Sequence, residues 1–182
     1  MTVKSFKFKD PDGHDLELIW FPPDKGKKKW HEQNEQLFLG IDHTAIAVSN
    51  TEQSLKFYQE LLGLKIKESS LNTGKTQADL DGLPHAVVRI TSLSTTEKGM
   101  GIELLDYIKP SEGRSRPKNW TSTVLANLQI ELVVNNIQDI VKELQNNGVK
   151  FISSHLVQLK NTSKQACLIP DPDGHVLLFI EE

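Results

Sequence analysis

Four polar side chains of this sequence lie in apolar segments that alternate with the period of a β-strand. They are His43, Glu103, Gln129 and Glu131. Every second residue of a strand shares one face, so each of these side chains has a defined set of neighbours. Imidazole nitrogen and carboxylate and amide oxygens on rigid strands are ligands for a divalent metal of intermediate hardness, with positions left open for a substrate. If the strands converge, His43, Glu103 and Gln129 predict a metal site.

The same residues also allow a structural interpretation. His43 fits a hydrogen-bonded core histidine as well as a ligand, and Gln129 and Glu131 fit the lining of an open, wet surface or an interface. Glu103 resists this interpretation, because a carboxylate between apolar neighbours on a central strand is costly to bury without a partner. Ala45 shares the face of His43 and leaves room for a ligand, and Tyr107 shares the face of Glu103; both are predicted to contact substrate.

An internal repeat supplies the elements that must position these side chains. Each copy is expected to contain a strand, a helix and three further strands, with Asn50 and Asn136 at the helix N-caps and Gly63 and Gly148 at the C-terminal ends. In order along the chain, the expected segments are 40–50, 51–62, 64–70, 85–93 and 99–107 in the first copy, and 128–136, 137–147, 149–154, 164–169 and 175–181 in the second. A sheet with one face under a helix must cover its other face, so we expect the copies to pair into a cup.

The pentapeptide Asp-Pro-Asp-Gly-His occurs twice, at residues 10–14 and 171–175. Proline at the second position and glycine at the φ > 0 position are typical of a hairpin turn. The first copy comes too early for a whole repeat to precede it. We therefore expect an α+β protein with an orphan hairpin (1–22), a linker (23–36), a first βαβββ module (37–107), a second linker (108–124) and a second βαβββ module (125–182).

Composition narrows the possible partners. The net charge is −3, with 21 Lys plus Arg against 24 Asp plus Glu, and neither nucleic-acid binding nor a nucleotide cofactor is expected. No apolar segment approaches the roughly 20 residues of a membrane helix. The single cysteine, Cys167, is interpreted as a packed residue of a reduced, cytoplasmic protein. Exposed hairpin edges predict a homodimer. Trp20, Trp30 and Trp120 are interpreted as covers of the edge of the cup or of a subunit interface.

The motifs together resemble one family. They are the segment Leu-Phe-Leu-Gly-Ile-Asp-His-Thr-Ala-Ile-Ala-Val (37–48), the helix with Ser-Leu-Lys-Phe-Tyr (54–58), Leu-Gly-Leu (62–64), Gly-Ile-Glu-Leu (101–104) and the Asp-Pro-Asp-Gly hairpin. This order resembles the vicinal oxygen chelate superfamily, which includes glyoxalase I, bleomycin and fosfomycin resistance proteins and extradiol dioxygenases. The resemblance implies paired modules whose sheets form a cup, and a divalent metal (Mn, Fe, Ni or Zn) with ligands on the first and last strand of each module. The corresponding positions are His43, Glu103, Gln129 and Leu178.

Leu178 departs from this ligand pattern, because a leucine has no lone pair to offer. The extradiol dioxygenase set of two histidines and a carboxylate is therefore not matched. The resemblance implies a carboxylate that moves a proton between adjacent carbons, and Glu131 is the candidate for it. Glu17 follows Gly13 by four residues, as Leu178 follows Gly174, so the orphan hairpin carries a ligand-type residue at the equivalent position.

Three functional hypotheses follow. The first is a metal-dependent lyase, isomerase or oxygenase that acts on a small substrate with vicinal oxygens. The second is a metal-free small-molecule binding protein of the bleomycin-resistance type. The third makes the chain the C-terminal portion of a four-module enzyme, with residues 1–22 as the remnant of the preceding module.

Overall fold

A computed structural model describes residues 2–32, 35–95, 99–111, 113–114, 121–125 and 127–182. The chain forms two compact units, each with its own four-stranded sheet. Unit 1 comprises Met1–Ala47 and Lys67–Glu112, and unit 2 comprises Val48–Ile66 and Gly113–Glu182. Trp120 and part of the 108–124 linker lie outside the described residues.

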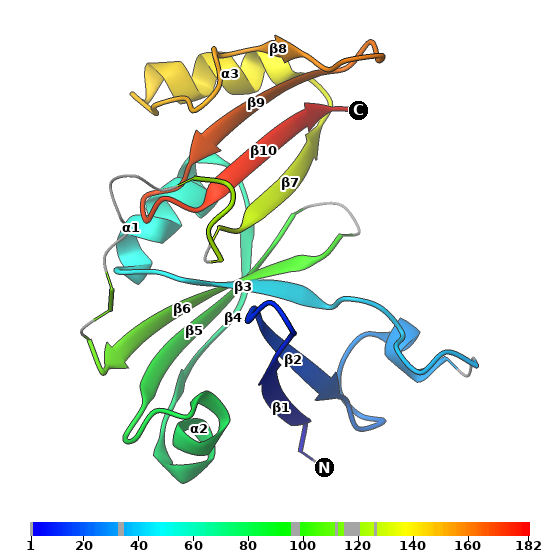
Figure 1. The fold of residues 1–182 in the computed structure, drawn as a ribbon, viewed down its shortest axis with the longest axis vertical. Helices are drawn as coiled ribbons and strands as arrows, with labels where there is room; N and C mark the ends of the chain where they lie inside the picture. Colours follow the sequence, from blue (N-terminus) through cyan, green and yellow to red (C-terminus); the bar gives the residue numbers. More distant parts are fainter. Residues whose placement is uncertain (1, 33–34, 96–98, 112, 115–120, 126) are drawn as a thin grey trace. The chain divides into compact units, whose positions relative to one another are not determined.

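The sheet of unit 1 has the strand order β3-β6-β5-β4 (Figure 1). Its strands are β3 His43–Ala47, β6 Gly101–Lys109, β5 Val87–Ser94 and β4 Lys65–Asn72. β3 is parallel to β6, and β5 is antiparallel to β6. One face of these strands is buried, with Ile46, Leu93 and Leu104 each at most 2% exposed, and the face that alternates with it carries the polar residues His43 and Glu103. The period-two interpretation of these strands is therefore confirmed.

The orphan hairpin also belongs to unit 1. β1 (Lys4–Lys9) and β2 (Asp15–Trp20) form a separate two-stranded antiparallel sheet. Its turn is closed by bonds from Gly13 N to Asp10 O and from Asp10 N to His14 O, both of 3.0 Å. Lys7 extends from β1 to the buried carboxylate of Asp81 at 2.5 Å, which attaches the hairpin to helix α2 (Gly74–Asp81).

Unit 2 contains the second sheet, with the strand order β7-β10-β9-β8. Its strands are β7 Gln129–Val134, β10 Val176–Glu181, β9 Gln165–Pro170 and β8 Val157–Gln158. Its helices are α1 Thr51–Leu55, continued by the π-helical turn η2 Lys56–Leu61, and α3 Ile137–Asn146. The predicted caps are present, because Asn50 accepts from Gln53 N and Asn136 from Asp139 N.

A buried hydrogen bond joins α1–η2 to the second turn of the repeated pentapeptide. Tyr58 Oη donates to Asp171 Oδ2 at 2.8 Å, and the two residues are 0% and 5% exposed. Burial raises the pKa of the Tyr58 phenol, and the neighbouring Asp171 charge raises it further, so the hydroxyl stays a donor. The other oxygen of Asp171 accepts from the backbone N–H groups of Asp173 and His175. This carboxylate therefore links the turn to a helix more than one hundred residues away in sequence.

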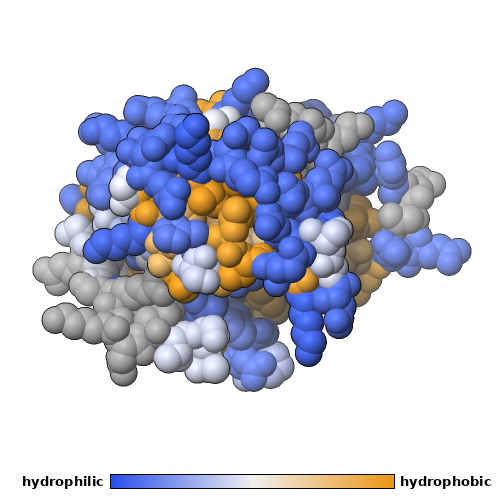
Figure 2. Space-filling model, turned by 90° about the horizontal axis from the view of Figure 1, so that it is seen from above, coloured by the Kyte–Doolittle hydropathy of each residue, from blue (hydrophilic) through white to orange (hydrophobic). Residues whose placement is uncertain are grey.

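The surface is mostly hydrophilic in the view of Figure 2, with its most extensive apolar area near the centre. The apolar core of unit 2 includes Ile137, Leu144, Ile169, Leu177 and Phe179, each no more than 2% exposed. Cys167 is fully buried among them, and burial raises the pKa of its thiol to about 11. The interpretation of Cys167 as a packed residue is confirmed.

Two segments differ from the sequence-based expectation. Residues 149–154 form no strand, because Ile152 and Ser153 both bond to the single carbonyl of Leu168 instead of continuing along β9, and the short strand β8 follows later at Val157–Gln158. Helix α2 was not predicted. It contains only two apolar residues, Ala78 and Leu80, so its sequence carries no amphipathic period to detect.

Candidate functional site

His43 and Glu103 lie on neighbouring strands at the start of the β3–β6 pair. The parallel register places His43 opposite Gly101 and Ala45 opposite Glu103, so the two polar side chains occupy adjacent positions on one face. His43 Nε2 is 3.3 Å from Glu103 Oε2, and the two side chains are 19% and 23% exposed. They are therefore in contact with each other and accessible to a small solute.

Asp42 contacts the other ring nitrogen of His43. Its Oδ2 atom is 3.1 Å from His43 Nδ1, while its Oδ1 atom accepts from the indole N–H of Trp30 at 2.8 Å and lies 3.3 Å from Lys27 Nζ. Burial by itself raises the pKa of Asp42, but the hydrogen bonds from His43 and Trp30 and the Lys27 charge outweigh it, and the net pKa is lowered. Asp42 is thus held as a carboxylate.

Glu103 is fixed from the opposite side. Ser92 on β5 stands opposite Glu103 in the antiparallel register, and its hydroxyl donates to Glu103 Oε1 at 2.7 Å. One carboxylate oxygen is thereby occupied, and Oε2 is directed to His43. Ser92 and His43 thus compensate the cost of partly burying the Glu103 carboxylate.

His43 contacts a carboxylate at each of its two ring nitrogens. An ionised Asp42 can only accept, so its contact with His43 requires the proton to be on Nδ1. A neutral His43 then directs the lone pair of Nε2 at the carboxylate of Glu103, 3.3 Å away. Two acceptors at this distance are stable together only with a proton or a cation between them. The geometry fits a doubly protonated His43 between two carboxylates, and it equally fits a metal-binding histidine whose second nitrogen donates to a carboxylate.

Small residues surround this pair. Gly101 lies beside His43, and a Cβ atom added there would stand 3.3 Å from the His43 Cβ atom. Ala45 is exposed and stands opposite Glu103 in the parallel register, and its contact with substrate stays a prediction. Tyr107 lies four residues further along β6, roughly 13 Å from Glu103 at the usual strand rise. Burial raises the pKa of Tyr107, the Lys7 charge opposes this, and Asp81 raises it again, so Tyr107 belongs to the contact with the hairpin.

Gln129 and Glu131 lie on β7 in unit 2, and both are exposed. In the parallel β10–β7 register, Leu178 is opposite Glu131 and Val176 is opposite Gln129. Within its own unit, Glu131 thus has an apolar neighbour at the position where the family pattern would supply a ligand. The roles of Gln129 and Glu131 stay predictions.

One further acidic group has ligand-type spacing among the described residues. Asp10, Asp12 and His14 bring their polar atoms within 4.8 Å of one another in the exposed first turn. Asp10 Oδ1 accepts from the backbone N–H groups of Asp12 and His14, and its other oxygen contacts the His14 ring at 2.9 Å. These bonds form the turn, and they explain why the three residues lie close together.

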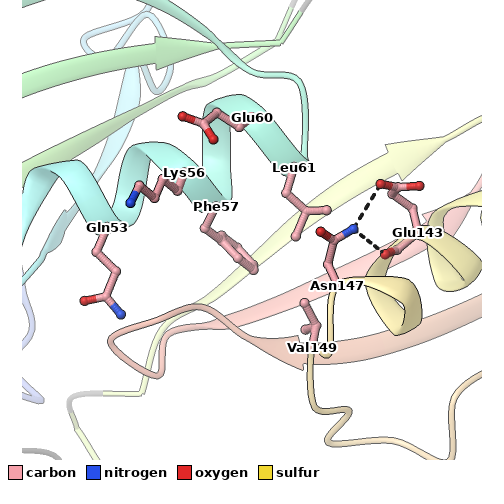
Figure 3. A pocket seen from close by; sticks show the side chains of 8 residues that line it. All are labelled: Gln53, Lys56, Phe57, Glu60, Leu61, Glu143, Asn147 and Val149. Carbon is pink, nitrogen blue, oxygen red and sulfur yellow. Dashed lines mark hydrogen bonds between the residues drawn. The ribbon is translucent and has the colours of Figure 1, made fainter.

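A pocket in unit 2 is lined by residues other than the predicted site residues (Figure 3). Asn147 donates there to the backbone oxygen and to Oε1 of Glu143, at 2.9 and 3.0 Å. This side-chain amide is therefore engaged at the end of α3. The residues that line the pocket come from α1, η2, α3 and the segment after it: Gln53, Lys56, Phe57, Glu60, Leu61, Glu143, Asn147 and Val149. None of them was predicted to take part in the chemistry.

A family model of the glyoxalase/bleomycin resistance protein/dioxygenase superfamily matches residues 40–179. The chain belongs to this superfamily. A glyoxalase family protein from Bacillus cereus has 22% identity and a TM-score of 0.71, over 83% of this chain and 99% of its own. Another from Enterococcus faecalis has 20% identity and a TM-score of 0.58, over 80% of this chain and all of its own. A search of the curated proteins finds no match.

Membership confirms the predicted resemblance and the α+β fold with two mixed four-stranded sheets. Proteins of the superfamily commonly bind divalent metals and small molecules and often form dimers. No helix in the described part of this chain is long and apolar enough to cross a membrane.

Sequence reasoning missed Asp42, Trp30 and Ser92 as site residues. Asp42 had a weak signal, because a carboxylate directly precedes His43 in the sequence. Trp30 and Ser92 had none, because their contacts depend on chain folding and strand register.

Proposed function

We propose that the chain binds a divalent metal through His43 Nε2 and Glu103 Oε2 and acts as a lyase, isomerase or oxygenase on a small substrate with adjacent oxygens. The observation that carries this proposal is the contact of His43 Nε2 with Glu103 Oε2 at 3.3 Å, while Asp42 contacts the other ring nitrogen of His43. Their partly exposed position and the small residues Ala45 and Gly101 beside them support room for a substrate.

The donor set fits the metals that the superfamily uses. Imidazole nitrogen and carboxylate oxygen suit manganese, iron, nickel and zinc. Asp42 orients His43, and Ser92 orients Glu103, so both ligand atoms are preorganised. A bound divalent ion would polarise the substrate oxygens and stabilise negative charge that develops on them.

The rest of the proposed chemistry rests on exposed residues of β7. Gln129 is proposed as a weak additional ligand through its amide oxygen. Glu131 is proposed to accept and return the proton that moves between adjacent carbons of the substrate. Leu178 opposite Glu131 gives this carboxylate an apolar neighbour and offers no competing ligand atom.

Elemental analysis of protein purified without chelator tests the metal proposal. Wild-type protein is expected to hold close to one equivalent of divalent metal, and His43→Ala and Glu103→Ala to lose it. His14→Ala is the matched control, because His14 also contacts an aspartate but has no facing glutamate. Metal that persists in His43→Ala, or that is lost in His14→Ala, would contradict the proposed site.

A second candidate function is metal-free binding of an amphipathic small molecule. Leucine at 178, a position where the family pattern supplies a ligand, favours it. Thermal unfolding in the presence of a panel of small amphipathic compounds separates the two functions. Under the second function, a stabilising compound protects His43→Ala and Glu103→Ala as well as it protects the wild-type protein.

A further inference from the structure

The orphan hairpin exposes one apolar face. Phe6 and Phe8 on β1, and Leu16 and Trp20 on β2, share one face of the hairpin and are 57%, 40%, 44% and 48% exposed. The rings of Phe6 and Phe8 are 5.9 Å apart. Phe38, which is 63% exposed, lines one hollow together with Phe6 and Trp20. We call these five residues, together with Leu18 and Leu37 between them, the hairpin face.

The residues around the second copy of the pentapeptide show how the equivalent hairpin face is buried in unit 2. Counted from the shared Asp-Pro-Asp-Gly turn, the residues that correspond to Phe6, Phe8, Leu16 and Leu18 are Cys167, Ile169, Leu177 and Phe179. In β9 and β10 these four residues are at most 2% exposed. The same face of the same kind of hairpin is therefore fully covered in unit 2, whereas Phe6, Phe8 and Leu16 are 57%, 40% and 44% exposed in the orphan copy.

The other face of the hairpin is already in use. Lys7 alternates with Phe6 and Phe8 along β1 and pairs with Asp81 of α2. Because successive side chains of a strand point to opposite faces, the hairpin face is directed away from this contact. It is available for docking without any rearrangement of the Lys7–Asp81 pair.

The exposed area matches that of a dimer interface. Taking about 200 Å² for an aromatic side chain, the four aromatic residues expose on the order of 400 Å², and Leu16 and Leu37 add to this. A standard interface buries about 800 Å² per partner, of which somewhat more than half is apolar. The hairpin face therefore supplies the apolar area that one partner of such an interface contributes.

The two ends of the hairpin carry charges of opposite sign. Lys4 lies at the open end of the hairpin, next to Trp20, with its Nζ atom 5.4 Å from the ring centroid. Asp10 and Asp12 lie at the turn end. In an antiparallel arrangement of two hairpins, each basic end meets the acidic end of the other.

We propose that the hairpin face docks a second copy of this chain, with the two hairpins stacked face to face about a two-fold axis. The aromatic residues of each copy fill the hollow between Phe6, Trp20 and Phe38 of the other, and Lys4 of each copy faces the partner's turn. This interface does not depend on the proposed chemistry at His43.

Sedimentation equilibrium of the full chain tests the interface. The wild-type protein is expected to be a dimer at micromolar concentration. Phe6→Glu is expected to raise the dimer dissociation constant by about 30-fold or more, as for a central interface residue. Leu71→Glu is the matched control, because Leu71 is an equally exposed strand residue (58%) on β4 and outside the hairpin. Circular dichroism checks that each variant is folded.

Charge reversal tests the orientation. Lys4→Glu and Asp12→Lys are each expected to weaken the dimer, and the double variant is expected to recover affinity. A double variant weaker than both single ones overturns the antiparallel arrangement. A wild-type monomer at about 100 μM, or a Phe6→Glu variant that dimerises as the wild type does, overturns the interface. In the monomeric case, binding of the chain to phosphatidylcholine vesicles would assign the face to a lipid surface instead.

Discussion

Asparagine at position 42 should damage the metal site more than alanine does, although it is closer in shape to aspartate. Trp30 and Lys27 both donate toward Oδ1 of Asp42. In Asp42→Asn these donors hold the oxygen of the introduced amide on their side, so its NH2 group must face His43. The amide would then donate to Nδ1, and the His43 proton would move to Nε2, where it points at Glu103 and blocks metal coordination.

The size of this effect follows from the contacts. Loss of a carboxylate that orients a metal-binding histidine costs about 10- to 100-fold in metal affinity, or roughly 1.4 to 2.7 kcal/mol. We expect this loss for Asp42→Ala. Asp42→Asn must in addition break a hydrogen bond of about 1 kcal/mol to restore the metal-binding tautomer, and should bind about fivefold more weakly still.

Calorimetric titration with Mn²⁺ or Zn²⁺ measures the affinities, and ¹⁵N spectra of the imidazole report the tautomer in the metal-free protein. Asp10→Asn is the matched control, because Asp10 contacts His14 in the same way and lies outside the site. Combining Asp42→Asn with Lys27→Met and Trp30→Phe removes both donors, so the amide can rotate and affinity should recover. Wild-type affinity and an Nδ1–H tautomer in Asp42→Asn would refute the reasoning.

Two further predictions concern stability and reactivity. Tyr58→Phe leaves a buried oxygen of Asp171 without its donor and should lower the free energy of unfolding by about 1.5 to 3 kcal/mol. The melting temperature should fall by roughly 2 to 4 °C per kcal/mol. His14→Ala at the exposed turn is the control and should shift the melting temperature by less than about 1 °C; equal shifts in the two variants would contradict the role of the buried bond. The raised pKa of Cys167, about 11, keeps its thiol protonated, so alkylation by iodoacetamide at pH 9 should be at least about 50-fold slower in the folded than in the unfolded protein. The raised pKa contributes to the stability of the fold below the unfolded pKa near 9, and this contribution is lost as the pH rises toward 11. Rapid labelling of the folded protein at pH 9 would contradict the raised pKa of Cys167.

Much of the fold could be predicted from local sequence. Asn50 and Asn136 cap the two predicted helices, and Gly63 and Gly148 end them with φ of 74° and 69°. Such signals act over a few residues, so they can be read without the rest of the chain. Helix α2 was missed, because its sequence has no apolar period. The prediction of a strand at 149–154 was wrong, because this segment bonds to β9 at a single point.

The candidate site could be predicted only in part. His43 and Glu103 were identified from strand faces and family resemblance, and the structure places them 3.3 Å apart. The supporting contacts of Trp30 with Asp42 and of Ser92 with Glu103 join residues 12 and 11 positions apart in sequence. Their geometry depends on how the chain folds back and on the register of β5 and β6. No local pattern encodes that register.

The repeated pentapeptide separates what the sequence determines from what tertiary structure decides. In both copies the first aspartate accepts from the same two backbone amides, and the glycine has φ of 96° or 92°. The sequence by itself therefore determined the turn, because the hydrogen bonds that the first aspartate accepts from the backbone lie within five residues. The second oxygen of the aspartate contacts exposed His14 in one copy and buried Tyr58 in the other. Only tertiary structure decided this difference, since it depends on whether a helix from elsewhere in the chain packs against the turn.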